Sequence, residues 1–244
     1  MINLLNGDCL EEMEKLRDDG VQVDLILTDP PYNLSVKNKN TKDRKLKGRK
    51  ALNYYFGDWD NMERQDFLDF TREWYELCVD LLRDGGAMVS FFSKEDVNYL
   101  GWLGEEYDMR TKTIFTWHKV NPVPSLRKVN YLSSCEYAWI GSKGGEKWTF
   151  NFKLQKEMHN FYESSNKAGY GVTSHPTEKP VQLMKHLLEI HSNEGDLVLD
   201  PFMGSGTTGV ACLDEGRDFI GIEINPEYYQ MAVERCKTKQ TKLI

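Results

Sequence analysis

The tetrapeptide Asp29-Pro30-Pro31-Tyr32 brings together residue types that can act jointly on one ligand. It follows the apolar run 23–27, which predicts a buried strand. The two prolines remove hydrogen-bond donors from the end of that strand and stiffen the backbone there. A carboxylate, the free backbone carbonyl of Pro30 and an aromatic ring are therefore expected at the carboxyl end of a strand, where open α/β sheets bind their ligands.

This arrangement matches the exocyclic amine of adenine or cytosine, which donates two hydrogen bonds. Two acceptors can engage both hydrogens while the ring of Tyr32 stacks on the base. Accepting both hydrogens draws the nitrogen lone pair out of ring conjugation, so that the nitrogen can attack a methyl group. Considered alone, however, Asp-Pro-Pro-Tyr could also be a simple turn.

A second motif lies near the C-terminus. Residues 196–200 predict another buried strand, which runs into the glycine-rich turn 201–209 and a helix-like stretch. The predicted strand 219–223 follows and ends on Glu223. Strand, glycine turn, helix, strand and acid form the pattern of a nucleotide-type cofactor site, in which the carboxylate binds ribose hydroxyls. The same glycine spacing fits a dinucleotide site equally well.

The order of the two motifs separates these alternatives. Only about twenty residues follow Glu223, so the other strand–helix units must precede it in a permuted sheet. With Asp-Pro-Pro-Tyr at 29–32 ahead of Asp-Pro-Phe-Met-Gly-Ser-Gly-Thr at 200–207, the chain resembles the β-group DNA amino-methyltransferases. The resemblance extends over nearly the whole chain and includes Gly7-Asp8-Cys9 and the segment 175–180, His-Pro-Thr-Glu-Lys-Pro.

The resemblance implies an α/β protein with a permuted Rossmann-like methyltransferase fold. Its sheet would be mostly parallel and seven-stranded, with one antiparallel strand and helices on both faces. Residues 1–244 would form a single domain that transfers a methyl group from S-adenosylmethionine to adenine N6 of DNA. Cytosine N4 is the alternative, although those enzymes more often carry Ser where this chain has Asp29.

Two other classes fit the sequence less well. We call residues 29–32 the lip and residues 201–209 the glycine loop. RNA methyltransferases can carry a similar lip, but their glycine loop precedes it in the chain. A nicotinamide oxidoreductase would fit the glycine pattern and leave residues 29–32 without a role. A possible homodimer and a possible cognate restriction endonuclease remain open as partners besides DNA.

Roles at the expected site follow from the lip and from the resemblance. The catalytic residues would be Asp29, Pro30, Pro31 and Tyr32, acting on a base rotated out of the duplex. Lys179 resembles a contact to the methionine end of the cofactor, but it could be only a charge at a helix start. The expected cofactor contacts are Asp8, Cys9, Asp29, Thr177, Lys179, Asp200, Phe202, Gly204, Ser205, Gly206, Thr207 and Glu223.

Within that set, the resemblance assigns separate tasks. Glu223 would bind the ribose hydroxyls, while Asp8 and Cys9 would line the adenine ring. Asp200 would face the methionine amino group. The glycine loop would shape the wall under the cofactor.

The net charge is −7, but the basic residues are unevenly distributed along the chain. Between Lys37 and Lys50 the only acid is Asp43, and a basic cluster on an acidic body indicates a local phosphate site. A solvated loop is the alternative. We expect DNA contacts from the basic loop 33–60 and the short recognition-type loop 153–174, and individually from Lys42, Arg44, Lys45, Lys47, Arg49, Lys119, Arg127 and Lys128.

The remaining composition narrows the class. No apolar run of 18 residues and no leader is present, so the sequence predicts a soluble, cytoplasmic protein with no membrane partner. Five scattered cysteines argue against disulfides, and together with five histidines of irregular spacing they predict no metal site. His186 and His191 are expected on a helix surface.

Alternating patterns predict the elements. Helices are expected at 10–16, 63–82, 96–106 and 180–191, with Gly85-Gly86 as the stop signal of the second. Strands are expected at 2–6, 23–28, 87–92, 111–118, 135–140, 148–152, 196–200 and 219–223, with a loop at 153–174. Because Asp8 lies near one end and Glu223 near the other, both chain ends must meet at one cofactor pocket.

Overall fold

The computed structural model describes residues 1–33, 62–122, 124, 128–145, 147–165 and 178–243. Eight strands form one sheet in the order β1-β8-β7-β2-β3-β5-β4-β6. All neighbours are parallel except β5, which runs antiparallel to β3 and β4. Their bounds are β1 Ile2–Asn6, β2 Val23–Thr28, β3 Leu82–Phe92, β4 Met109–Lys119, β5 Cys135–Lys143, β6 Phe161–Ser164, β7 Leu197–Asp200 and β8 Asp218–Glu223.

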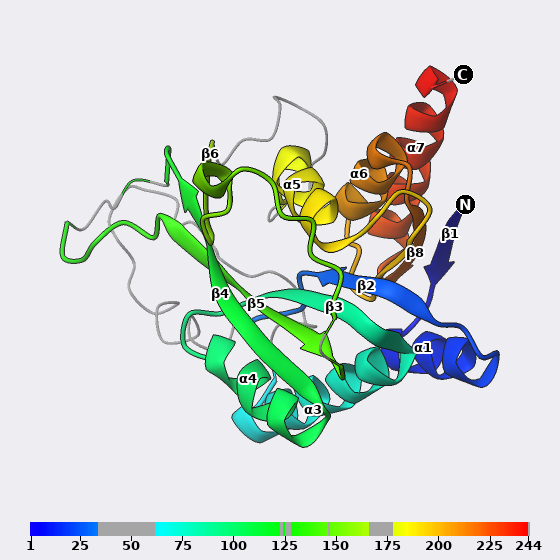
Figure 1. Ribbon diagram of the computed structural model, residues 1–244, viewed down its shortest axis with the longest axis horizontal. Coiled ribbons are helices and arrows are strands. Elements are labelled where there is room, and N and C mark those ends of the chain that lie inside the picture. Colours follow the sequence, from blue (N-terminus) through cyan, green and yellow to red (C-terminus); the bar gives the residue numbers. More distant parts are fainter. Residues whose placement is uncertain (34–61, 123, 125–127, 146, 166–177, 244) are drawn as a thin grey trace, which may run out of the picture.

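Helices cover both faces of the sheet (Figure 1). Helices α1, α3 and α4 lie on one face and α5, α6 and α7 on the other. Their bounds are α1 Cys9–Asp18, α3 Arg64–Leu81, α4 Val97–Glu106, α5 Val181–His191, α6 Thr207–Glu215 and α7 Pro226–Leu243. A 3-10 turn, η3, spans Gln155–Glu157.

Strand β3 shows how the sequence builds this three-layer core. Met88 and Phe92 join the cluster under α1, α3 and α4, whereas Val89 and Phe91 join the cluster under α5 and α6. The side chains of neighbouring strand residues point to opposite faces. A central strand covered by helices on both faces is therefore apolar at nearly every position, as expected for a parallel sheet.

The two chain ends meet, as predicted. Strand β1 pairs in parallel with β8, and the register sets Asn6 beside Glu223. The amide of Asn6 donates to the Glu223 carbonyl at 2.7 Å, and Gly7 N donates to the same oxygen at 3.2 Å. The next residue, Asp8, caps α1 by accepting from Leu10 N at 2.9 Å. The start of the chain is thus fixed against the end of the strand that follows the glycine loop.

The sheet has eight strands and not the seven that were expected, because β6 adds one at the edge. Residues 161–164 lie in the segment predicted to be a loop, yet they pair with β4 in the register Thr116 to Phe161. Trp117 strengthens the pairing by donating from Nε1 to Ser164 Oγ at 2.9 Å. Only 1% of Trp117 is exposed, so this ring belongs to the core.

The Gly85-Gly86 pair has a different role from the predicted helix stop. Helix α3 ends at Leu81, and both glycines lie inside β3. A Cβ on Gly85 would stand 2.6 Å from the carbonyl oxygen of Lys147, and one on Gly86 would stand 2.9 Å from that of Asp24. These positions need glycine because neighbouring backbone comes too close for a side chain.

Two further predictions about this region were wrong. Residues 148–152 do not form a strand. Backbone hydrogen bonds from Thr149 N to Gly85 O and from Asn151 N to Ile190 O hold them to β3 and α5, and the Asn151 side-chain amide also donates to the carbonyls of Glu189 and Ser192. His191 is buried and not on the helix surface, because the rings of Trp148 and Phe150 cover it at 5.4 and 5.8 Å.

Candidate active site

The lip begins directly after β2, and both oxygens of Asp29 have partners. Oδ1 accepts a hydrogen bond from the Tyr32 hydroxyl, and Oδ2 forms an ion pair with Lys179 Nζ. The Tyr32 ring packs edge-on against Phe92 at 6.1 Å. Each carboxylate oxygen has two lone pairs, so Asp29 keeps capacity to accept from a further donor.

Lys179 is a buried cation at the centre of this site, with 6% of its side chain exposed. Besides Asp29, it pairs with Glu136 Oε2 at 3.1 Å. Its ammonium lies 5.6 Å from the ring centre of Tyr32 and 5.1 Å from that of Phe91, within cation–π range. Burial alone would lower the pKa of Lys179, but the two carboxylates raise it above its ordinary value. The carboxylates of Asp29 and Glu136 therefore favour the charged form of Lys179.

Glu136, on β5, extends the charged group towards the sheet edge. It also accepts from Lys119 at 2.9 Å, so negative and positive groups alternate in the row Asp29, Lys179, Glu136, Lys119. Burial would raise the pKa of Glu136, but the two lysines hold it below its ordinary range. Sequence reasoning missed Glu136; its signal was a lone acid near the start of a strand that becomes buried from Ala138 onwards.

The row changes the interpretation of two predicted residues. Lys179 is more than a charge at a helix start, because it pairs with Asp29 and Glu136 at the lip; its predicted contact to the methionine end of the cofactor stays a prediction. Lys119 was expected to contact DNA, but its side chain is 12% exposed, paired with Glu136 and 5.6 Å from the Trp117 ring centre. A phosphate contact by Lys119 would have to compete with that pair.

The glycine loop connects β7 to α6, and its shape depends on Gly206. That residue has φ of +81°, and a Cβ on it would lie 2.8 Å from Ala232 Cβ on α7. Gly204 also has a positive φ, of +52°. The left-handed backbone and the close approach of α7 both require glycine here. The loop can consequently present bare backbone to a ligand.

Asp200, at the end of β7, is buried where the glycine loop begins. It accepts from Thr28 Oγ1 at 2.8 Å, Thr208 Oγ1 at 2.7 Å and Phe202 N at 3.1 Å. Only 3% of the residue is exposed, and burial raises its pKa to about 6. In this structure Asp200 joins β2, β7 and α6; its predicted contact to a methionine amino group stays a prediction.

Glu223 ends β8 beside the loop. Its Oε2 accepts from Gly204 N at 3.0 Å and its Oε1 from Asn225 N at 2.8 Å. Burial, its largest influence, raises the pKa of Glu223, and the two amides lower it. Cys9 is close enough that the charges of Asp8 and Glu223, after burial, raise the pKa of its thiol. The structure therefore brings Asp8, Cys9, Gly204 and Glu223 together.

The other predicted loop residues are oriented differently. Phe202 packs against Trp74 at 5.7 Å and Phe70 at 6.1 Å, under the loop. The hydroxyls of Ser205 and Thr207 accept hydrogen bonds from Arg235 of α7, a residue that sequence reasoning did not single out. Nothing local in α7 indicates this contact.

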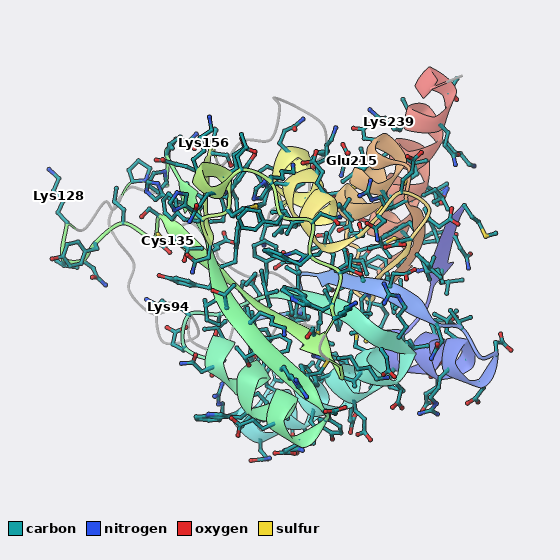
Figure 2. The ribbon with its side chains drawn as sticks, in the orientation of Figure 1. Lys94, Lys128, Cys135, Lys156, Glu215 and Lys239 are labelled. Carbon is teal, nitrogen blue, oxygen red and sulfur yellow. The ribbon has the colours of Figure 1, made fainter. Side chains whose placement is uncertain are left out.

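Several expected residues lie outside the described part of the chain: Thr177, Lys42, Arg44, Lys45, Lys47, Arg49 and Arg127. Lys128 is described and exposed, and Figure 2 shows it at the far tip of the connection between β4 and β5, pointing away from the sheet. Among the described residues, no cluster of three or more metal-ligating side chains occurs. No described helix combines the length and apolarity needed to cross a membrane.

Comparison with known proteins identifies the family. A family model described as DNA methylase, of the N6 and N4 type, matches residues 23–234. The chain belongs to this DNA methylase family. Type II methyltransferase M2.DpnII of Streptococcus pneumoniae is 29% identical over 97% of this chain and 90% of its own length. Type II methyltransferase M.HpaI of Haemophilus parainfluenzae is 30% identical over 97% of this chain and 74% of its own.

Solved structures agree with this assignment. A complex of M1.HpyAVI with S-adenosylmethionine has a TM-score of 0.75 and 33% identity, covering 96% of this chain and 98% of that one. The cytosine-N4-specific PvuII methyltransferase has a TM-score of 0.74 at 22% identity, covering 96% and 86%, and supports the fold alone. This DNA methylase uses S-adenosylmethionine, which excludes the nicotinamide alternative.

The described residues fit that cofactor. A half-buried acid faces a loop that carries no Cβ at Gly204 and Gly206, and the small apolar side chain of Cys9 is buried nearby. When bound, S-adenosylmethionine supplies an electrophilic methyl group. The protein's own contribution is to hold the loop, through Glu223 and Asp200, on the same sheet edge as Asp29.

Proposed function

We propose that this DNA methylase methylates the exocyclic N6 of adenine in duplex DNA. The observation that carries the proposal is the ion pair of Asp29 with buried Lys179, which holds an acceptor at the sheet edge. Asp in the first position of the lip favours adenine over cytosine N4. The base would have to leave the duplex, because a stacked and paired amine cannot reach the lip.

The proposed chemistry uses few groups. Asp29 and the Pro30 carbonyl accept the two amine hydrogens, and Tyr32 stacks on the base. The nitrogen lone pair would form the bond to the methyl group while the methyl–sulfur bond of the donor breaks and its electron pair stays on sulfur, leaving S-adenosylhomocysteine. One amine proton would pass to water during or after transfer. An aromatic amine is too weak an acid for Asp29 to deprotonate it beforehand. Alignment of the reacting atoms supplies most of the rate.

Mass spectrometry of nucleosides tests the base directly. DNA would be incubated with the protein and isotope-labelled S-adenosylmethionine, digested, and separated into its nucleosides. We expect label in N6-methyl-2′-deoxyadenosine. Label in N4-methyl-2′-deoxycytidine would change the assigned base to cytosine, and label only in an RNA control would overturn DNA as the substrate.

The wider setting is also a proposal. The relatives M2.DpnII and M.HpaI are named as type II methyltransferases, which supports a restriction-modification system with a cognate endonuclease in the cytoplasm. We place the DNA-binding surface on the basic loop 33–60, Lys128 and the segment 153–174, within a single domain. Because the segment 153–174 is short, it offers few DNA contacts, and a second subunit in a homodimer would add more.

A further inference from the structure

Two adjacent residues, Glu178 and Lys179, connect the two halves of the active site. Lys179 pairs with Asp29 at the lip. Glu178 accepts instead from Arg235 Nη2 at 2.7 Å, and the Thr207 hydroxyl lies 3.4 Å from the same oxygen. One short stretch of backbone thus joins the catalytic acid on one side to the glycine loop on the other.

Arg235 completes the connection from α7. Its Nη1 donates to the Ser205 carbonyl at 2.8 Å, to the Ser205 hydroxyl at 2.8 Å and to Thr207 Oγ1 at 3.3 Å. The side chains of Arg235 and Glu178 are only 10% and 13% exposed. A planar guanidinium presents its donors in a fixed fork, so this geometry is held more rigidly than a lysine could hold it.

Packing supports the same loop from behind. Ala232 lies one helical turn before Arg235 on α7, and its Cβ stands against Gly206 so closely that a side chain would not fit. The glycine loop is therefore fixed to α7 by packing and by hydrogen bonds. Since α7 is also tied to Glu178, the Arg235–Glu178 pair is a second link between loop and lip, besides the hydrogen bond from Thr28 to Asp200.

We infer that Arg235 and Glu178 are positioning residues for methyl transfer. Neither occupies the lip, but together with Lys179 they set where the methyl donor stands relative to Asp29. Misplacement of reacting groups by about 1 Å can cost a hundredfold in rate. The inference needs methyl transfer to DNA and holds for adenine or cytosine alike, so it does not depend on which base is modified.

The test uses Arg235→Gln, Glu178→Gln and the double variant in the full-length protein. The single-turnover rate of label transfer to duplex DNA would be measured at saturating S-adenosylmethionine and DNA, counting label in any base. We expect each single variant to be about ten- to a hundredfold slower. The double variant should be no slower than the slower single one, because both substitutions remove a charge from the same link.

Three further measurements separate positioning from mere stability. Arg235→Lys, which keeps a charge opposite Glu178, should recover part of the rate. Arg217→Gln is the matched control: Arg217 is also partly buried and donates to Ser192 Oγ and O at 3.0 and 2.9 Å, at the amino ends of the strands. It should lower the thermal midpoint and leave the rate unchanged. DNA affinity should be unchanged in all variants.

Two outcomes would overturn the inference. Single-turnover rates within about twofold of the wild type for folded Arg235→Gln and Glu178→Gln would show that the pair does not set the reacting geometry. Independent, multiplying losses in the double variant would show that the two residues do not act through one link. If Arg235→Gln does not fold, the near-isosteric Glu178→Gln decides alone. A wild type that labels cytosine would count only against the adenine proposal.

Discussion

Lys179 and Asp29 stand 150 positions apart in the chain and form an ion pair that is largely shielded from solvent. In this pair the ammonium of Lys179 compensates the negative charge of Asp29 at the lip. An isolated buried carboxylate would be costly, whereas the charge of Asp29 is compensated and its side chain is oriented by the cation that it shares with Glu136. The acceptor expected to engage the target amine is therefore held by a residue from the other end of the sequence.

Replacing Lys179 by Met should remove methyl transfer and weaken the fold. It would leave Asp29 and Glu136 without their shared cation in a buried place, a type of change that costs about 3–5 kcal/mol. Urea unfolding at pH 7.5 and single-turnover assays would measure the two effects. A control, Lys185→Met, breaks the pairs with Asp214 and Glu215 away from the lip and should keep the rate. Full activity in Lys179→Met would contradict this account.

Replacing Glu223 by Gln should weaken S-adenosylmethionine binding and leave DNA affinity unchanged. The variant keeps one acceptor for Gly204 N but loses the charge that strengthens bonds to ribose hydroxyls, worth about 1.5–3 kcal/mol, roughly ten- to a hundredfold in Kd. Calorimetry with cofactor alone measures it. Glu189→Gln, on α5, is the control. Equal cofactor affinity in the Glu223 variant and the wild type would remove the ribose role.

His191 should make the fold less stable in mild acid. Burial, together with the nearby His186, lowers its pKa from 6.5 to about 3. The unfolded chain therefore binds the proton at a higher pH than the native protein does. The stability contributed by neutral His191 is complete above about pH 6.5 and is lost as the pH falls towards 3.

Comparison with His191→Phe isolates this contribution. Between pH 7.5 and 5.0 the wild type should lose about 2 kcal/mol more unfolding free energy than the variant. Phe suits the contacts with Trp148 and Phe150, and no group in the described part of the chain forms a hydrogen bond with His191 Nδ1. His159→Gln, at an exposed position, should follow the wild type. Parallel pH curves for His191→Phe and wild type would contradict a neutral buried His191.

Neutralising Lys42, Arg44, Lys45 and Lys47 should weaken DNA binding at low salt. For every phosphate group that the variant no longer neutralises, the slope of log affinity against log salt should fall by roughly 0.9. Cofactor affinity should not change. The control neutralises Lys15 and Lys237, which are exposed on α1 and α7. An unchanged salt slope in the fourfold variant would move the DNA contacts to Arg127, Lys128 and the segment 153–174.

The sequence predicted the strongly periodic elements because their signals are local. Every strand flanking the lip and the glycine loop was recovered from apolar runs ended by turn residues. Strand β6 was missed because four residues are too few to show alternation. Helix α7 was overlooked although Pro226 opens it, a favourable residue at a first helical position.

The site was predictable only in part, for a physical reason. Asp29 and Glu223 end strands, so topology alone assigns them to one edge of the sheet. The contacts that orient them are long-range: Lys179 reaches Asp29 across the fold, and Arg235 reaches Ser205 from another helix. His191 shows the same limit, because helical spacing does not reveal which loop covers a residue.

The single-turnover rate of Asp29→Ala on duplex DNA, at saturating labelled S-adenosylmethionine, tests the central claim most directly. We predict a loss of at least about 1.5–3 kcal/mol of transition-state stabilisation, roughly ten- to a hundredfold or more in rate, with the fold retained. A folded Asp29→Ala protein that keeps most of its rate would contradict the claim that this carboxylate accepts the target amine.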